Sequence, residues 1–248
     1  ENSTIDEFDY VIAIGGGRAI DIGKALAFKS SRRCIVVPTS ASTDAPTSRI
    51  SVKYQNGYFE KYTYYTQSPD LVLVDTAILI NSPIHFLTAG IADGLSTFIE
   101  ARTVRENFGK NTLGAAPTLA AEAIAEKCRD VLLKNAEAAV EANKRKEITV
   151  EFDAVVEANT LLSGIGFESG GLSIAHALHN AMVSLWGGEI KGSHGQIIAL
   201  TTLQQLRIEG RHDELTSHQE LFEKLNLPIT YEMLSIFPSV DKLKKIVD

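Results

Sequence analysis

The sequence of 248 residues has few cysteines, no excess of basic residues and no long apolar run. Its two cysteines, Cys34 and Cys128, form no C-x-x-C pair, which excludes a zinc ribbon and a thioredoxin-like redox motif. Lys and Arg number 24 against 31 Asp and Glu, and the net charge of −7 argues against a nucleic-acid-binding protein. No apolar run approaches the ~20 residues that a membrane-spanning helix needs. We therefore expect a cytoplasmic protein with two buried thiols that binds neither nucleic acid nor a membrane.

What is present is an ordinary globular composition, with 44% hydrophobic and 22% charged residues, which excludes disordered and fibrous classes. The length fits one large domain or two modest ones. The chain has no initiator Met, enters a strand pattern at Tyr10 and stops at Asp248 inside a helical pattern, without Pro or Gly punctuation at either end. We expect either a fragment of a longer protein or a processed chain.

Residues 8–85 alternate between strand and helix patterns. Three short apolar runs predict buried strands, at residues 11–14, 34–37 and 71–74. Apolar residues at helical spacing predict a helix within 18–29, and alternating stretches at 48–54 and 59–65, on either side of Gly57, predict a hairpin. Strand, helix and strand in this order indicate a parallel sheet of βαβ units whose strands are buried on both faces.

After Pro83 the strand patterns end and Ala-rich helical patterns dominate. We expect helices at residues 90–102, 118–134, 148–164, 172–185, 196–207, 221–225 and 241–247. The predicted fold class is therefore α/β plus all-α. A partial Rossmann-like parallel-sheet domain is expected over residues 1–85, and an all-helical domain over residues 86–248.

Three successive glycines, Gly15 to Gly17, separate the first predicted strand from the first predicted helix. They would let consecutive backbone N–H groups approach an anion, and the helix N-terminus adds partial positive charge, so a pyrophosphate would fit here. The spacing is not the G-x-G-x-x-G of the dinucleotide fingerprint, and a tight turn without a ligand explains the glycines equally well. The position after a buried strand favours phosphate binding.

A run rich in small hydroxyl residues, 38–48, follows the second predicted strand. We call it the hydroxyl-rich loop. It contains several Ser and Thr side chains and the carboxylate of Asp44. On composition alone it is an ordinary polar loop. Its place at the carboxyl end of a parallel strand, where ligands collect in open α/β sheets, favours a role in binding.

The predicted helical part contains a set of side chains that could bind a metal ion. Asp93 lies near the start of an apolar helix, where a buried carboxylate is rare unless it is paired or bound to metal. His176 and His179 are three residues apart and share a helical face, and His194 follows a glycine-rich loop. Asp with two or three His suits Zn²⁺ with an open coordination position. Each His alone is equally typical of a hydrogen-bonded structural residue, and H-E-x-x-H does not occur.

Together these segments resemble the glycerol dehydrogenase family, within the iron-type alcohol dehydrogenase and dehydroquinate synthase superfamily. The matching segments are residues 15–17 with Asp21, 41–48, 69–75, 90–93 with 96–97, 169–172 with His176, 179–180 and 194–195. The resemblance implies a dehydroquinate synthase-like fold, zinc and NAD as cofactors, a homo-oligomer, and a small polyol such as glycerol as the substrate.

The resemblance also implies the metal ligands. Asp93, His176 and His194 would bind the zinc ion. Iron-dependent members of the superfamily usually have a His four residues after the Asp, and here that residue is Thr97. The resemblance therefore implies three protein ligands and favours zinc over iron.

Further roles follow from the same resemblance. The NAD-binding residues would be Gly15, Gly16, Gly17, Arg18, Ala19, Thr39, Ser40, Ala41 and Ser42, with Ser48, Ile50 and Tyr54 lining the nicotinamide. Asp44 would accept a hydrogen bond from a substrate hydroxyl. His179 would support a metal ligand or relay a proton.

The sequence departs from the family at two places. The upstream strand–helix units that hold the adenosine, and the helices beyond residue 248, are not in this sequence. After His194-Gly195 the family commonly has an acid and a lysine, and here Gln196-Ile197 follow.

Two alternatives to a glycerol dehydrogenase remain. One is glycerol-1-phosphate dehydrogenase or a dehydroquinate synthase-like lyase, which the lack of Lys or Arg between Leu172 and Trp186 disfavours. The other is a truncated, catalytically impaired chain that keeps the metal site and binds NAD weakly.

Overall fold

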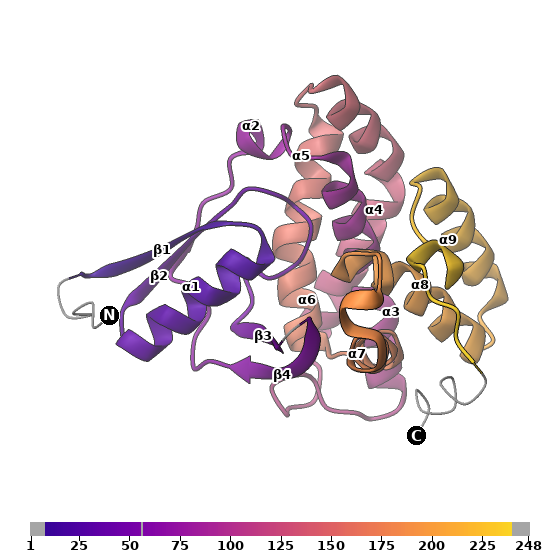
Figure 1. Cartoon of the computed structure of the whole chain (residues 1–248), viewed down its shortest axis with the longest axis horizontal. Helices are drawn as coiled ribbons and strands as arrows, with labels where there is room; N and C mark the ends of the chain where they lie inside the picture. Colours follow the sequence, from indigo (N-terminus) through magenta and orange to yellow (C-terminus); the bar gives the residue numbers. More distant parts are fainter. Residues whose placement is uncertain (1–7, 56, 240–248) are drawn as a thin grey trace.

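The computed structural model describes residues 8–55 and 57–239. Figure 1 shows a small sheet with one helix on the left and a larger assembly of helices on the right. This arrangement confirms the predicted class of α/β plus all-α. Within the described ranges, no helix combines the length and the apolar character needed to cross a lipid bilayer.

The sheet has the strand order β1-β2-β5 and is parallel throughout, as predicted. Its strands are β1 (Tyr10–Gly15), β2 (Arg33–Pro38) and β5 (Leu71–Val72). Helix α1 (Gly17–Ser30) connects β1 to β2 and packs on one face of the sheet (Figure 1). The third strand is shorter than the predicted run of 71–74.

The expected burial of these strands on both faces is wrong for β1 and for β5, where Leu71 is 50% exposed. The side chains of Ile12 and Ile14 are 57% and 63% exposed, whereas Val11 and Ala13 are buried against α1. Side chains alternate across a strand, so one covering helix buries only every second residue. Among the described residues, α1 covers one face of β1 and nothing comparable covers the other. Both thiols are buried, as expected.

The predicted hairpin is confirmed as an antiparallel pair apart from the parallel sheet, formed by β3 (Ile50–Gln55) and β4 (Tyr58–Tyr64). It is fastened to α1 by hydrogen bonds, because Nζ of Lys24, which pairs with Asp21 of the same helix at 3.0 Å, donates to the carbonyl of Ile50. Asp21 also accepts a hydrogen bond from the N–H of Val52 at 3.1 Å. The other side of the hairpin packs against the helical part through apolar contacts with α7 (Ile174–Trp186).

The helical part is organised around α3 (Ile84–Glu106), in which almost every residue between Leu87 and Ala101 is buried. A helix buried on all sides has no polar face. It packs against α4 (Leu119–Arg145), α6 (Ser163–Gly170) and α8 (His194–Ile208). The remaining helical segments are α2 (Thr76–Leu79), α5 (Val150–Glu157), α9 (His212–Lys224), η3 (Gly187–Glu189) and η4 (Glu232–Leu234).

The predicted single helix over 148–164 is wrong. The structure has α5, then one π-helical turn, η2 (Ala158–Leu162), and then α6, which continues to Gly170. A π-helical turn within an α-helix is rare and is frequent at functional sites. It leaves the spacing of apolar residues close to that of an α-helix, so the hydrophobic pattern does not reveal it.

Other helix boundaries also differ from the prediction. The helix predicted for 118–134 continues to Arg145, and the one predicted for 172–185 begins at Ile174. The short helix predicted for 221–225 is the end of α9, which begins at His212. The helix predicted for 241–247 lies outside the described residues.

Candidate active site

Three side chains from three helices converge in the helical part. Asp93 comes from the buried stretch of α3, His176 from the first turn of α7, and His194 is the first residue of α8. One ligand atom of each lies within 4.8 Å of the others. Oδ1 of Asp93 is 3.2 Å from Nε2 of His194 and 3.7 Å from Nε2 of His176. Residues separated by long stretches of sequence therefore form one group, which we call the Asp–His–His cluster.

The chemistry of the cluster suits a cation. The side chain of Asp93 is 1% exposed, and neither of its oxygens accepts a hydrogen bond of good geometry from a described residue. Burying an ionised carboxylate without compensation is costly, so these oxygens require positive charge beside them. One carboxylate oxygen and two imidazole nitrogens can hold Zn²⁺ and leave a coordination position open.

A carboxylate that we did not identify from the sequence supports His176. Oε2 of the fully buried Glu100 lies 2.5 Å from Nδ1 of His176. Its other oxygen accepts hydrogen bonds from the backbone N–H groups of Ser173 at 2.7 Å and His176 at 3.0 Å. This contact keeps the proton on Nδ1 and turns the lone pair of Nε2 toward Asp93, an arrangement common among metal-binding histidines.

The sequence carried a signal for Glu100. It lies seven residues after Asp93 in the same apolar helix, a spacing of nearly two turns, so both carboxylates project from one face. A second acidic residue in a helix that is otherwise almost wholly buried needs a partner, and here that partner is an imidazole.

His179 lies behind His194. Its Nε2 is 2.9 Å from Nδ1 of His194, and its Nδ1 is 3.0 Å from Oδ1 of Asn180. Nδ2 of Asn180 in turn donates to the hydroxyl of Tyr62 in β4 at 2.8 Å. For Nε2 of His194 to offer a lone pair to a metal ion, its Nδ1 must carry the proton and donate it to His179. The structure thus connects one side of the cluster to the hairpin.

Burial and neighbouring charges shift the pKa values of the groups around the cluster. Burial alone would lower the pKa of His176, but the carboxylates of Glu100 and Asp93 raise it to about 9. Burial, and then the nearby Asp93 carboxylate, raise the pKa of Asp44 to about 7. Burial and the neighbouring imidazoles lower the pKa of His179 well below its usual value, so that ring is neutral. The negative charge of the buried carboxylates around the cluster would stabilise a cation there.

The three glycines form a tight turn at the end of β1, as the sequence predicts. Gly15 has a φ of +149°, which favours glycine, and a Cβ there would lie 2.7 Å from that of Ala19. Among the described residues, no side chain caps the N-terminus of α1, so its first backbone N–H groups are not engaged by a capping residue. Arg18 is exposed and Ala19 is half-buried in the first turn of α1.

The hydroxyl-rich loop lies directly against this turn. The N–H of Thr39 donates to the carbonyl of Gly15 at 3.0 Å. A Cβ added at Gly16 would lie 3.4 Å from Oγ of Ser40. The hydroxyls of the buried Ser40 and Ser42 are 3.1 Å apart. The structure therefore brings these predicted NAD-binding residues together.

The remaining predicted residues occupy two places. Ala41 is buried, and its carbonyl accepts a hydrogen bond from Asn159 of η2 at 2.9 Å. Ser48 and Ile50 are buried beside Lys24 of α1, to which their carbonyls bind, rather than at the glycine turn. Tyr54 lies in β3, half-buried, and burial raises its pKa to about 12.

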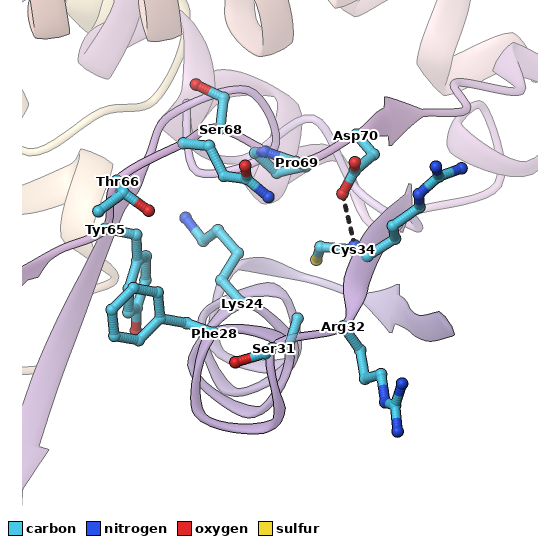
Figure 2. A pocket seen from close by; sticks show the side chains of 13 residues that line it. Lys24, Phe28, Ser31, Arg32, Cys34, Tyr65, Thr66, Ser68, Pro69 and Asp70 are labelled. Atoms are coloured by element: carbon cyan, nitrogen blue, oxygen red, sulfur yellow. Dashed lines mark hydrogen bonds between the residues drawn. The ribbon is translucent and has the colours of Figure 1, made fainter. Parts of the chain in front are cut away.

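A separate cavity of about 430 Å³ lies at the opposite ends of the parallel strands (Figure 2). It is lined by the end of α1, the start of β2 and the segment before β5. Two of its charged groups are engaged, since Lys24 pairs with Asp21 and Asp70 accepts a hydrogen bond from the N–H of Cys34 at 2.8 Å. None of the predicted site residues lines it.

Known proteins of similar sequence and structure match this chain over most of its length. Residues 1–83 match the family model described as iron-containing alcohol dehydrogenase. The chain is 43% identical to the glycolaldehyde reductase of Halobacterium salinarum, over 92% of this chain and 63% of that protein. The crystal structure of glycerol dehydrogenase from Schizosaccharomyces pombe superposes with a TM-score of 0.93 at 38% identity, over 97% of this chain and 62% of that one. The structure of a probable glycerol dehydrogenase from Sinorhizobium meliloti has a TM-score of 0.91 at 37% identity, over 96% and 68%. The chain thus spans less than two thirds of the length of the first two proteins.

Proposed function

Because the chain belongs to the glycerol dehydrogenase family of iron-containing alcohol dehydrogenases, we propose that it serves the zinc-dependent, NAD-linked oxidation of glycerol or a similar small vicinal diol. Glycerol would be converted to dihydroxyacetone by hydride transfer to NAD⁺. The observation that carries the proposal is the convergence of Asp93, His176 and His194, with the buried carboxylate of Asp93 facing both imidazoles.

In this proposal Asp93, His176 and His194 hold the zinc ion. Zinc supplies a Lewis acid that lowers the pKa of a substrate hydroxyl. Glu100 holds the ring of His176, and His179 holds the ring of His194 or relays a proton. The hydroxyl of Thr97 is engaged with Ser163 at 2.9 Å, which supports three protein ligands and zinc rather than iron.

The α/β part binds and orients NAD. Gly15, Gly16 and Gly17, with Arg18 and Ala19 at the start of α1, hold the pyrophosphate through backbone N–H groups. Residues 39–42 contact the nicotinamide side, which Ser48, Ile50 and Tyr54 line. Asp44 accepts a hydrogen bond from a substrate hydroxyl. The cofactor carries the redox step, and these residues supply position and electrostatics.

On the resemblance alone we also propose the organisation of the protein. Residues 1–85 form a partial NAD-binding domain, and residues 86–248 form the zinc- and substrate-binding domain. The protein is a cytoplasmic homo-oligomer that binds neither nucleic acid nor a membrane.

One relative widens the substrate class. The similar protein from Halobacterium salinarum is named a glycolaldehyde reductase, and reduction of a carbonyl beside a hydroxyl is the reverse of diol oxidation. We therefore include small hydroxyaldehydes, reduced with NADH, in the proposal. A phosphorylated substrate is disfavoured, since α7 carries no Lys or Arg between His176 and Trp186.

The test combines metal analysis with turnover. The purified protein should contain zinc, reduce NAD⁺ in the presence of glycerol and be inactive with glycerol 1-phosphate. The variants His176→Ala and Asp93→Asn should lose both zinc and activity. Full activity in a zinc-free variant, or turnover of the phosphate ester alone, would refute the proposal. A calorimetric titration with NAD⁺ separates an active chain from an impaired one, which would bind the cofactor weakly.

A further inference from the structure

The hydroxyl-rich loop is fastened to the π-helical turn and its neighbour. Three hydrogen bonds span the contact: Nδ2 of Asn159 to the carbonyl of Ala41 at 2.9 Å, Oγ1 of Thr47 to the carbonyl of Thr160 at 2.8 Å, and Oγ of Ser163 to Oδ2 of Asp44 at 3.2 Å. One turn of helix therefore holds the loop at its beginning, middle and end. This is a structural reason for the π turn, which sets the direction in which these groups point.

The contact leaves no space between the loop and the helices. A Cβ at Gly164 would lie 2.0 Å from Oγ1 of Thr47, and a Cβ at Gly90 would lie 2.0 Å from the carbonyl oxygen of Ala41. Such distances are well below van der Waals contact, so the loop rests directly on the backbone of α3 and α6. The position of Asp44 is therefore set by these helices.

Two hydroxyls hold the carboxylate of Asp44 with a defined direction of hydrogen bonding. Oγ1 of Thr97 lies 2.9 Å from Oγ of Ser163, which lies 3.2 Å from Oδ2 of Asp44. Oγ of Ser163 donates its single proton to Oδ2 of Asp44. Thr97 must then donate to Ser163. Both residues are almost completely buried, so water does not compete for these bonds.

Helix α3 carries both Thr97 and the candidate metal ligand Asp93. Thr97 is one turn beyond Asp93 in α3, so the two side chains project from one face. The hydrogen bonds from Thr97 through Ser163 thus fix Asp44 relative to the Asp–His–His cluster. A diol whose reacting hydroxyl is at the cluster presents its second hydroxyl at a set distance from it. The carboxylate of Asp44 lies close enough to the cluster for the charges of Asp93, His176 and His194 to act on its pKa, so it is the candidate partner for that second hydroxyl.

We propose that Ser163 and Thr97 are positioning residues that hold Asp44 for the second hydroxyl of a vicinal diol. The two hydrogen bonds, from Thr97 to Ser163 and from Ser163 to Asp44, would thereby favour diols over simple alcohols. The inference rests on the proposed function and deepens it. A site built to hydrogen-bond a substrate hydroxyl disfavours the analogue that lacks it, because its own polar group is then left unpaired.

The test uses Thr97→Val, which replaces the hydroxyl by a methyl group of similar size, and Ser163→Ala. We expect kcat/KM for glycerol to fall by about 10- to 100-fold in Ser163→Ala, the range for a lost hydrogen bond to a charged group, and by less in Thr97→Val, which removes a hydrogen bond between two hydroxyls. For 1-propanol, which has no second hydroxyl, kcat/KM should be unchanged, and so should the zinc content. Thr97→Ser keeps the hydroxyl and should restore the preference for glycerol.

Thr201→Val is the matched control, since it removes a buried threonine hydroxyl from α8 that binds only carbonyls of its own helix. A second readout is independent of turnover. Backbone hydrogen exchange in residues 38–48 should accelerate in Thr97→Val and Ser163→Ala but not in the control.

The outcomes separate this inference from the proposed function. Equal losses for glycerol and 1-propanol, or unchanged diol preference in both variants, would overturn the inference while zinc and glycerol oxidation in the wild type still stand. If the wild type binds zinc but oxidises no diol, the proposed function fails and the diol selection fails with it. Faster exchange of the loop would then show only that the two hydroxyls hold it.

Discussion

Oε2 of Glu100 lies 2.5 Å from Nδ1 of His176, in a place where both side chains are buried. The carboxylate and Asp93 come from one face of α3, so a single helix supplies one candidate ligand and the support of another. On the other side, His194 is held by the neutral ring of His179. The cluster therefore has one strongly and one weakly supported imidazole, because hydrogen bonds to a charged group are the stronger ones.

The first prediction concerns Glu100→Gln. Glutamine can accept only through one oxygen, so either the backbone N–H groups or Nδ1–H of His176 would face an amide donor. We expect zinc affinity, measured by competition with a chelator, to fall by about 10- to 100-fold. Glu106→Gln is the matched control, since it is an exposed residue of the same helix that pairs with Arg211. Equal zinc affinity in wild type and Glu100→Gln would contradict the role assigned to this carboxylate.

The second prediction is that zinc stabilises the folded protein. A ligand that binds only the folded state adds about 2.7 kcal/mol at a free concentration 100 times its Kd. The melting temperature of the wild type should therefore rise with zinc and fall when a chelator is added. Asp93→Asn should lose this zinc-dependent increment, whereas Asp130→Asn, at an exposed position of α4, should keep it. An increment of the same size in Asp93→Asn would place the metal elsewhere.

The sequence predicted features that depend on residues close together in the chain, whereas features that depend on long-range contacts required the structure. Strand, helix and strand in order predicted the parallel sheet, and the structure confirms it. The glycine turn and the hydroxyl-rich loop were each predicted to follow a buried strand, and the N–H of Thr39 donates to the carbonyl of Gly15. Asp93, His176 and His194 were grouped through the family resemblance and do converge, but their role as zinc ligands stays a prediction.

Three features became apparent only in the structure. The exposure of Ile12 and Ile14 depends on which elements cover the sheet, not on the apolar run itself. The π turn at 158–162 keeps a helical hydrophobic pattern and differs only in hydrogen bonding. Glu100 contacts His176, which lies 76 residues further along the chain, so the partner of this carboxylate is known only from the structure.

The third prediction concerns stability against pH. His218 in α9 is buried, its Nδ1 donates to the carbonyl of Glu214 at 2.8 Å, and its Nε2 has no partner among the described residues. Burial lowers the pKa of His218 below its usual value. The unfolded chain therefore binds a proton more readily, and the stability that the neutral ring contributes is full above about pH 6.5 and is lost as the pH falls below it.

Urea unfolding across this pH range checks the effect. The free energy of unfolding should fall with decreasing pH in the wild type, and the slope should be smaller in His218→Gln. His212→Gln, at the exposed first residue of the same helix, should keep the wild-type slope. Identical slopes in all three proteins would show that His218 does not contribute to this dependence.

The last prediction tests the close contact between α3 and the hydroxyl-rich loop. Alanine is a better helix former than glycine by up to about 1 kcal/mol, so Gly90→Ala would stabilise an isolated helix. In the folded protein its Cβ would lie 2.0 Å from the carbonyl oxygen of Ala41, a backbone atom that cannot rotate away. Overpacking of this kind costs about 1–3 kcal/mol, which outweighs the gain. We expect Gly90→Ala to lower the free energy of unfolding, whereas Gly188→Ala, with no heavy atom of a described residue within 4 Å of its Cβ, should change it little. A stabilised Gly90→Ala protein would mean that the loop moves freely away from α3, and the fixed position of Asp44 would be lost with that contact.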